Sequence, residues 1–275
     1  MFTVPNPAMK NRLSISVFLL LAALAANLGA AEVKVKPIRA LMITGGCCHD
    51  YENQKRILSE GISKRANVTW TILHEGGTSG DHKVSIYHKK DWAKGYDVVL
   101  HNECFGKLTD VPFIENIAKA HKDGTPAVVI HCALHSYRHA KTDEWRKVLG
   151  VKSMRHQQKG PVDVVTMKPK HPVMKGFPKP WRSPNGELYE ILEVYPGCTP
   201  LGLAFGSRTD KDHTCIWVNQ YGKGRTFGTS LGHHNETMDN EAYLGLVTRG
   251  LLWACEKLGE DGKPKPGYEA KAAKK

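Results

Sequence analysis

Short apolar runs alternate with mostly polar, amphipathic stretches through the first half of the chain. Few polar residues interrupt these runs, which is typical of parallel strands that are covered on both faces. The stretches between them have helical length, so the pattern predicts βαβ units in a mostly parallel sheet. The expected strands are residues 38–43, 67–73, 97–100 and 127–130, and the expected helices are residues 52–65, 112–122 and 142–149.

The pattern changes in the second half of the chain. Short apolar runs follow one another with hairpin-like polar turns between them, which predicts added antiparallel strands. A tail from Gly259, rich in lysine and proline, is predicted to be disordered over residues 259–275. The expected strands are residues 162–167, 187–195, 199–204, 214–219 and 225–230, followed by a closing helix at residues 241–258.

Residues 1–31 have the features of a secretory signal peptide. Lys10 and Arg12 precede an apolar run over residues 14–28, and small residues follow that run as a cleavage site. The run is too short and wrongly flanked for a spanning helix. A retained membrane anchor and a start at Met9 are the alternatives. We therefore predict a cleaved signal, no later membrane span, and a periplasmic or secreted product.

Composition limits the function classes. The formal charge is +12, but the lysines are scattered rather than set in one stripe, so nucleic acid is not an expected partner. The chain has seven cysteines and no C-x-x-C spacing, which excludes zinc-ribbon and thioredoxin-type sites. Cys198 and Cys215 lie on neighbouring expected strands but out of register, so we predict that they do not form a disulfide.

Histidines and other reactive side chains follow four of the expected strands. Ligands of an open α/β sheet bind beyond the carboxyl ends of its strands, so this coincidence is the main sequence evidence for a functional site. The alternative is that these are loop residues with only local hydrogen bonds. The residues are His49 and Asp50, His101 and Glu103, His131, Cys132 and His135, and then His233, His234 and Glu236.

These residue types suit two kinds of chemistry. Imidazole nitrogens and a carboxylate bind divalent metal ions such as zinc, and the candidate ligands are His49, Glu103, His131 and His233. Histidine and carboxylate side chains also act as general acids and bases. The predicted catalytic residues are His49, Asp50, His131, Glu187 and His233. The predicted substrate-binding residues are Gly45, Gly46, Glu103, Cys132, His135, Tyr189, His234 and Glu236.

Two motifs leave alternatives open. The Gly45-Gly46 turn permits close backbone approach and can aim amide hydrogens at an anion, or it is simply a tight turn. It is not a dinucleotide fingerprint, so no nucleotide cofactor is expected. Glu187, at the start of an expected strand, either faces the site or is a surface charge on an edge strand.

Cys132 stands directly after an expected buried strand, where a nucleophile is found in some α/β enzymes. A nucleophile elbow requires small residues two places before and two places after the nucleophile, because the turn is strained. Ile130 and Leu134 occupy those places here. We therefore predict a partly buried thiol rather than a nucleophile, which disfavours amidotransferase activity.

Taken in order, the motifs resemble those of the trehalose-utilisation (ThuA-like) family over residues 38–258, within an expected domain of residues 32–258. The resemblance implies a three-layer, flavodoxin-like fold related to class I glutamine amidotransferases. It also implies a link to sugar metabolism, especially to disaccharides oxidised at carbon 3. The matching segments are residues 44–46, 49–50, 131–133, 171–173, 187–189, 221–225, 231–233 and 250–254.

The leading hypothesis is an exported enzyme that acts on a sugar or 3-keto-glycoside by hydrolysis, elimination or isomerisation. A C3 ketone acidifies the neighbouring C–H bond, and His131 or His49 would remove that proton. A metal ion or amide donors would stabilise the enolate. The alternative is a non-catalytic carbohydrate-binding module. A second copy of the chain is the only macromolecular partner that we keep open.

Overall fold

The computed structural model of the protein describes residues 1–2 and 35–271. The predicted signal peptide and its cleavage site lie outside these described residues, apart from the first two. Within the described part of the chain, no helix combines the length and the apolar character needed to cross a bilayer. The folded body begins at Lys36.

One nine-stranded sheet organises this body, in the order β2-β1-β3-β4-β9-β8-β7-β5-β6. The first five strands of that order are parallel, and their succession is the 2-1-3-4-5 order of flavodoxin-like folds. The remaining strands are antiparallel. The strands are β1 (Ile38–Gly46), β2 (Val68–His74), β3 (Val98–Cys104), β4 (Ala127–Ile130), β5 (Val151–Thr166), β6 (Trp181–Val194), β7 (Cys198–Gly206), β8 (Lys211–Tyr221) and β9 (Gly224–Thr229).

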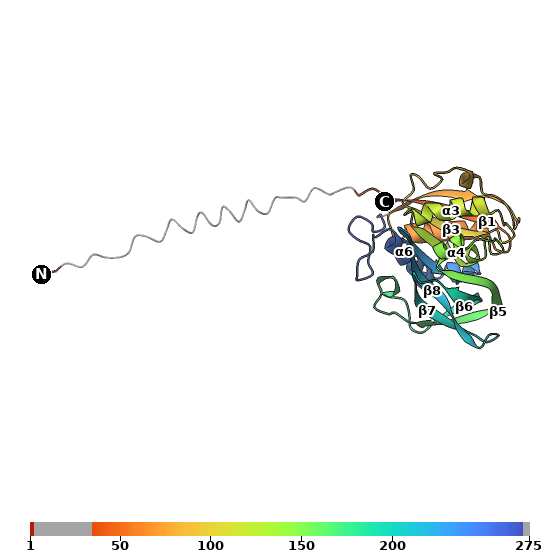
Figure 1. The fold of residues 1–275 in the computed structure, drawn as a ribbon. Coiled ribbons are helices and arrows are strands. Elements are labelled where there is room, and N and C mark those ends of the chain that lie inside the picture. The colour runs from red at the N-terminus through yellow and green to blue at the C-terminus, as the bar shows by residue number, and fades with distance from the viewer. Residues whose placement is uncertain (3–34, 272–275) are drawn as a thin grey trace. The chain divides into compact units, whose positions relative to one another are not determined.

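Helices cover both faces of the parallel half. The helices α2 and α6 pack together and contribute to one core, and α3 and α4, both labelled in Figure 1, pack together and contribute to the other. Side chains of β1 alternate accordingly: Ala40 and Met42 enter one core, and Leu41 and Ile43 enter the other. The longer helices are α2 (Tyr51–Ser63), α3 (Val111–Lys122), α4 (Glu144–Leu149) and α6 (Glu241–Ala254), with α5 (Asn235–Met238) as a single turn.

This architecture confirms the predicted α/β fold, a flavodoxin-like parallel sheet with antiparallel strands added in the second half. The helix starts also follow from local sequence. Asp50 and Asp110 accept hydrogen bonds from backbone amides of α2 and α3, and Asn240 does the same for α6. Pro112 lies in the first turn of α3, where its missing N–H costs nothing.

The strands β5 and β6 form a long irregular ribbon that the sequence pattern only partly predicted. They pair from Val151 to Val164 with four register shifts, and β5 joins β7 only through Val165 and Thr166. The expected strand began at residue 162, because the first half of β5 is polar and partly exposed. This ribbon carries Glu187, one of the predicted catalytic residues.

The C-terminal tail differs from the prediction of disorder up to Lys271. The closing helix ends at Ala254, and the chain then folds back on the body. Asn67 donates hydrogen bonds from its backbone N to the Tyr268 carbonyl (2.9 Å) and from its side chain to the Gly267 carbonyl (3.0 Å). These contacts hold the tail beside the start of β2.

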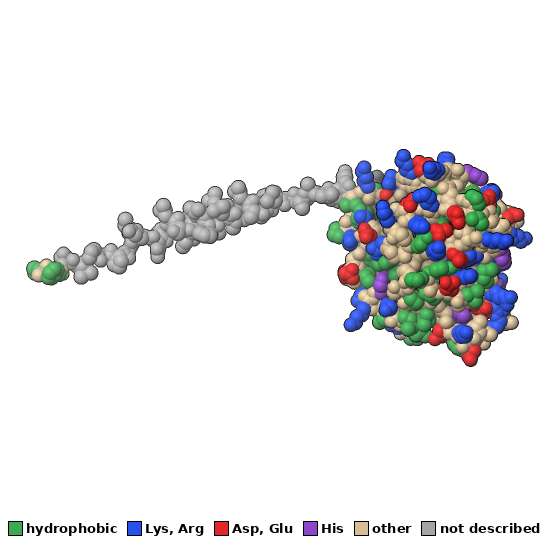
Figure 2. All heavy atoms as spheres, viewed as in Figure 1, with side chains coloured by type: hydrophobic (Ala, Val, Ile, Leu, Met, Phe, Trp, Pro, Cys, Tyr) green, Lys and Arg blue, Asp and Glu red, His purple; other side chains and the backbone are tan. Residues whose placement is uncertain are grey.

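Charged side chains of both signs are mixed on the surface of the body (Figure 2). In Figure 2, Lys and Arg side chains are interspersed with Asp and Glu over the visible face of the body.

Cys198 and Cys215 do not form a disulfide with each other, as predicted, and both are free thiols. Cys198 pairs with Asn219 of β8, so it lies out of register with Cys215.

Candidate functional site

Three histidines meet at the carboxyl ends of parallel strands. His49 follows β1, His131 follows β4 and His233 follows β9, and these are the residues that the strand-end argument expected to converge. Their ring centroids are 4.6–5.1 Å apart. One ring nitrogen from each lies within 4.8 Å of the other two. We call these three residues the histidine cluster.

Each histidine of the cluster is positioned by a residue with left-handed backbone. Cys48, just before His49, has φ of 89°, His131 itself has φ of 43°, and Gly232, just before His233, has φ of 102°. Such conformations are uncommon outside glycine and concentrate at functional sites. The chain therefore turns sharply after each strand and points the imidazole back over the sheet edge.

Hydrogen bonds fix the tautomer of His131. Its Nδ1 lies 2.7 Å from the Ser230 carbonyl oxygen, which only accepts, so Nδ1 carries the proton. Nε2 then presents a lone pair, 3.1 Å from Nδ1 of His233. A carbonyl behind the ring is the arrangement that orients metal-binding histidines.

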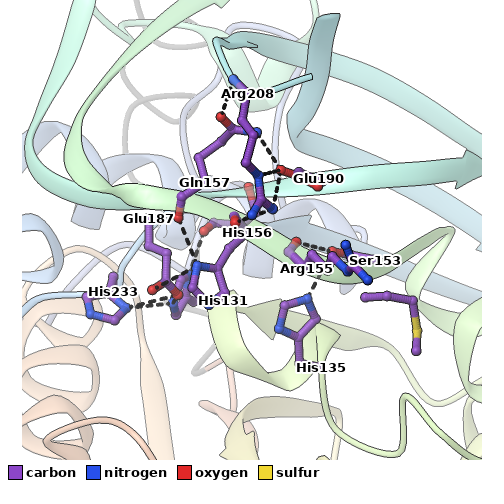
Figure 3. A network of polar contacts seen from close by, with 12 residues as sticks. His131, His135, Ser153, Arg155, His156, Gln157, Glu187, Glu190, Arg208 and His233 are labelled. Carbon is purple, nitrogen blue, oxygen red and sulfur yellow. Dashed lines mark hydrogen bonds and ion pairs between the residues drawn. The ribbon is translucent and has the colours of Figure 1, made fainter. Parts of the chain in front are cut away.

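Glu187 supplies a carboxylate to the cluster. Its Oε2 lies 3.6 Å from Nε2 of His131 and 3.4 Å from Nδ1 of His233, and its Oε1 lies 3.2 Å from Nδ1 of His156. Figure 3 shows these side chains facing one another. Burial alone would raise the pKa of Glu187, but contacts with His131 and His233 outweigh it and lower that pKa. The carboxylate therefore stays ionised.

Two histidines of the cluster, His49 and His131, favour their neutral forms. Burial, and then the charges of His131 and His233, lower the pKa of His49 to about 2. Burial also lowers the pKa of His131, against the opposing effect of Glu187. Nδ1 of His49 is buried and has no hydrogen-bond partner among the described residues. Neutral imidazoles with free nitrogens are the form that binds a metal ion.

An open cleft of about 610 Å³ lies beside the cluster. His49 and His233 line one part of it, and the predicted residues His234 and Glu236 line another. Glu236 is exposed on α5. A small molecule can therefore reach the histidine cluster from solvent through polar surroundings. The remaining lining residues are Cys48, Asp50, Gln54, Lys159 and Asn235.

Asp50 is held at the rim by local structure. Its side chain accepts hydrogen bonds from the side chains of Asn53 (2.7 Å) and Asn235 (2.8 Å), and these bonds lower its pKa. Asp50 also caps α2. The predicted catalytic residue Asp50 thus joins the start of α2 to the start of α5.

The prediction that Glu103 belongs to the metal and substrate site is wrong. Side chains alternate along β3, so Glu103 faces away from Cys104 and toward His101, whose Nδ1 lies 2.9 Å from its Oε1. His101 in turn contacts His121 (3.0 Å between the Nε2 atoms). All three side chains are buried, and burial raises the pKa of Glu103. Glu187 takes the place expected for Glu103.

The Gly45-Gly46 turn does not present amides to a ligand as expected. The backbone N of Gly46 donates to the Gly77 carbonyl (3.1 Å), so that amide is already occupied. A Cβ at Gly45 would lie 2.0 Å from the Glu75 carbonyl oxygen, and one at Gly46 would lie 2.3 Å from that of Cys104. The glycines therefore serve close backbone packing.

Three other predicted residues lie behind the histidine cluster, away from the cleft. Cys132 is buried in a single 3-10 turn (His131–Leu134), and burial raises the pKa of its thiol. His135 stacks on Tyr189 with 3.9 Å between ring centroids, and Tyr189 in turn lies 4.5 Å from the ring of His131. Both rings are buried. We find a supporting layer here rather than a substrate surface.

Sequence reasoning missed His156 and the polar network around it. His156 contacts Glu187 from β5, a stretch that was not predicted as strand. Next to it, Glu190 accepts hydrogen bonds from Gln157 (2.6 Å) and Arg208 (2.6 Å), as drawn in Figure 3. In the sequence, His156 was marked only as a histidine within a mostly polar stretch.

Comparisons with known proteins agree with this fold. A ThuA-like protein from Parabacteroides merdae is 18% identical, with 85% of this chain and 97% of that chain covered and a TM-score of 0.66. A ThuA-like protein from Bacteroides uniformis is 14% identical, with 80% and 92% covered and a TM-score of 0.59. No curated protein matches the chain significantly. The ThuA family model, described as trehalose utilisation, matches residues 39–254, and the chain belongs to this family.

Proposed function

We propose that the protein is an enzyme that acts on a sugar or 3-keto-glycoside, with a divalent metal ion such as zinc held by the histidine cluster. The observation that carries this proposal is the convergence of three imidazole nitrogens within 4.8 Å at one sheet edge. The substrate class rests on the family, whose model is described as trehalose utilisation.

The residues present fit a metal ion. Three histidine ligands and an open position are typical of catalytic zinc sites. His131 donates Nδ1–H to the Ser230 carbonyl, and Nδ1 of His49 is buried without a partner. His49, His131 and His233 would hold the ion, and two of them, His49 and His233, also line the cleft. When bound, the ion would supply Lewis-acid stabilisation of negative charge on a substrate oxygen.

Glu187 is the proton acceptor in this proposal. A ketone at C3 acidifies the C2–H bond, and loss of that proton places the electron pair in an enolate. The enolate can expel the substituent at C1, which leaves with the bonding pair and takes up a proton. Glu187 is ionised and its Oε2 lies 3.6 Å from Nε2 of His131, so it would accept the C2 proton of a ketone held beside the histidine cluster.

The second hypothesis, a non-catalytic carbohydrate-binding module, has less support. Such modules use exposed aromatic rings as platforms for sugar rings. Among the described residues that line the cleft, none is Trp, Tyr or Phe. Tyr189, which packs on His131, is 1% exposed and stacks on His135. The cleft instead offers titratable groups, which favours catalysis.

Metal binding tests the proposal most directly. The protein, purified without a histidine tag and without reductant, would be stripped with a chelator and dialysed against Zn²⁺. We expect one ion per chain. His131→Ala should weaken binding by more than the roughly tenfold to hundredfold cost of losing an outer-shell partner. His139→Ala, at an exposed histidine, is the matched control.

Turnover would then be followed with glycosides and their 3-keto derivatives. We expect conversion of a keto-glycoside that depends on added metal and is lost in His131→Ala. Carbohydrate binding without turnover, unchanged by chelation, would favour the binding module instead. Absence of zinc binding in the folded protein would overturn the proposal.

A further inference from the structure

Four of the seven cysteines lie around the end of β3, next to the histidine cluster. Cys47 and Cys48 follow β1 and form a disulfide between neighbouring residues. Cys104 ends β3, and its Sγ lies 3.7 Å from Sγ of Cys47. The parallel register of β1 and β3, which sets Gly46 beside Cys104, produces this approach. Cys132 packs behind Cys104.

Three of these sulfurs are close enough to share one ion. Sγ atoms of Cys47, Cys48 and Cys104 all lie within 4.8 Å of one another. Cys104 is buried, Cys47 is half-buried and Cys48 is exposed, so the group opens to solvent on the Cys48 side. The buried wall consists of Tyr51 and Cys132. The function proposed above uses none of these thiols.

The redox state decides how many ligands this group offers. While the disulfide is closed, Cys104 is the one residue of these three that has a free thiol. A dithiol reductant supplies two electrons and two protons, opens the disulfide to two thiols and becomes a disulfide itself. Three thiols then face one another, and a cation that binds them displaces their protons to solvent. Thiolates select soft cations, such as zinc, cadmium and copper(I), over magnesium or calcium.

We propose that reduction of the Cys47–Cys48 disulfide creates a second metal site, in which Cys47, Cys48 and Cys104 bind one thiophilic cation. The site is distinct from the histidine cluster in its ligand atoms, which are sulfur rather than nitrogen. It forms only in the reduced protein, so the redox state of the surroundings controls its occupancy. The inference does not depend on any catalytic role of the histidines.

Cadmium alone is a suitable probe, because cadmium–thiolate bonds absorb in the ultraviolet and imidazole ligation does not produce that band. The full chain would be reduced with a trialkylphosphine, which takes oxygen from water as the disulfide gains two hydrogens. After removal of the phosphine under anaerobic conditions, Cd²⁺ would be titrated in. We expect one equivalent to produce the band in reduced protein and none in oxidised protein.

Variants identify the ligands. Cys104→Ser should weaken cadmium binding by at least about tenfold, more than an outer-shell change. Cys48→Ser, in an exposed loop position, tests the same site with little risk to folding. Cys198→Ser, at a free thiol on β7, is the matched control and should bind like the unaltered protein. His233→Ala should keep the band, which separates this site from the histidine cluster.

Three results would overturn the inference. One is equal cadmium binding before and after reduction. Another is an unchanged band in both Cys104→Ser and Cys48→Ser. The third is absence of the band in reduced protein whose thiol count shows the Cys47–Cys48 disulfide to be open. Cooperative thermal unfolding of each variant would confirm that a lost band reports a lost ligand.

Discussion

Oε2 of Glu187 lies 3.4 Å from Nδ1 of His233, although the two residues come from different halves of the sheet. Glu187 is on the antiparallel ribbon of β5 and β6, and His233 follows β9, the last parallel strand. The parallel half therefore provides the histidines, and the added antiparallel half provides the carboxylate. Neither half contains the complete site.

Removal of this carboxylate should separate proton transfer from metal binding. We expect Glu187→Gln to lower kcat/KM by about a hundredfold or more, since that is the usual contribution of a general base. Zinc affinity should fall much less, because the three imidazoles remain. Steady-state kinetics and zinc dialysis on the same preparation would measure both. Glu193→Gln, an exposed change on the same strand, is the control; equal activity of the two variants would contradict the assigned role.

His156 should act by positioning Glu187. Its Nδ1 lies 3.2 Å from Oε1 of that residue and 2.8 Å from the Gln157 carbonyl oxygen. We expect His156→Leu to lower kcat/KM, by less than the roughly hundredfold loss expected for Glu187→Gln, and to leave zinc binding in dialysis almost unchanged, because Glu187 is not a ligand of the ion. His139→Leu, at an exposed histidine, should leave both measurements unchanged. A loss of zinc binding as large as that of His131→Ala would instead make His156 a ligand.

Cys132→Ser should retain most of the activity, because the thiol is buried behind Cys104 and has a raised pKa. Loss of a true nucleophile costs several orders of magnitude in kcat. Kinetics on the folded variant, with circular dichroism as the check on folding, would decide. A loss of that size would show that the chain uses cysteine catalysis after all.

Two glycines of α6 provide a matched test of the core. A Cβ at Gly250 would lie 2.2 Å from the Phe227 ring, whereas one at Gly245 would meet only the flexible end of Arg249 at 3.2 Å. We expect Gly250→Ala to lower the free energy of unfolding by about 2–3 kcal/mol through overpacking. Gly245→Ala should change it little or raise it by up to about 1 kcal/mol. Urea unfolding measures both; equal values would contradict the close α6–β9 packing.

The N-terminal segment should be removed as a signal peptide. We expect cleavage after Ala31, because a basic start, an apolar run and small residues precede it. Intact-mass measurement on protein recovered from the cell envelope would identify the new N-terminus. A chain that still begins at Met1 or Met9 would refute a cleaved signal.

The parallel half of the fold and the histidine cluster were predictable for the same reason. Buried parallel strands such as β1 and β4 are short apolar runs, and the residue after each run lies at a common edge. The start of β5 was not predictable, because its polar residues alternate on a partly exposed ribbon. His156, on that ribbon, was missed with it.

Glu103 shows a second limit of sequence reasoning. The prediction treated it as a loop residue beyond the strand, but β3 continues through Cys104. Glu103 therefore still obeys strand alternation and turns to the opposite face from Cys104. The apolar pattern does not locate the end of a strand whose last residues are polar. Because successive side chains lie on opposite faces of a sheet, an error of one residue in placing a side chain assigns it to the wrong face.

The position of β9 has a consequence for how the chain acquires its structure. β9 is the last strand in sequence, yet it lies in the middle of the sheet, between β4 and β8. Ala127 pairs with Val99 of β3 on one side but with Thr226 of β9 on the other, so this second edge of β4 stays open until most of the domain has been synthesised. Strands that are far apart in the sequence pair slowly. Until they do, the unpaired edge of β4 is exposed and can pair with another chain. Truncated products that stop before Gly224 should therefore aggregate rather than persist as smaller folded domains.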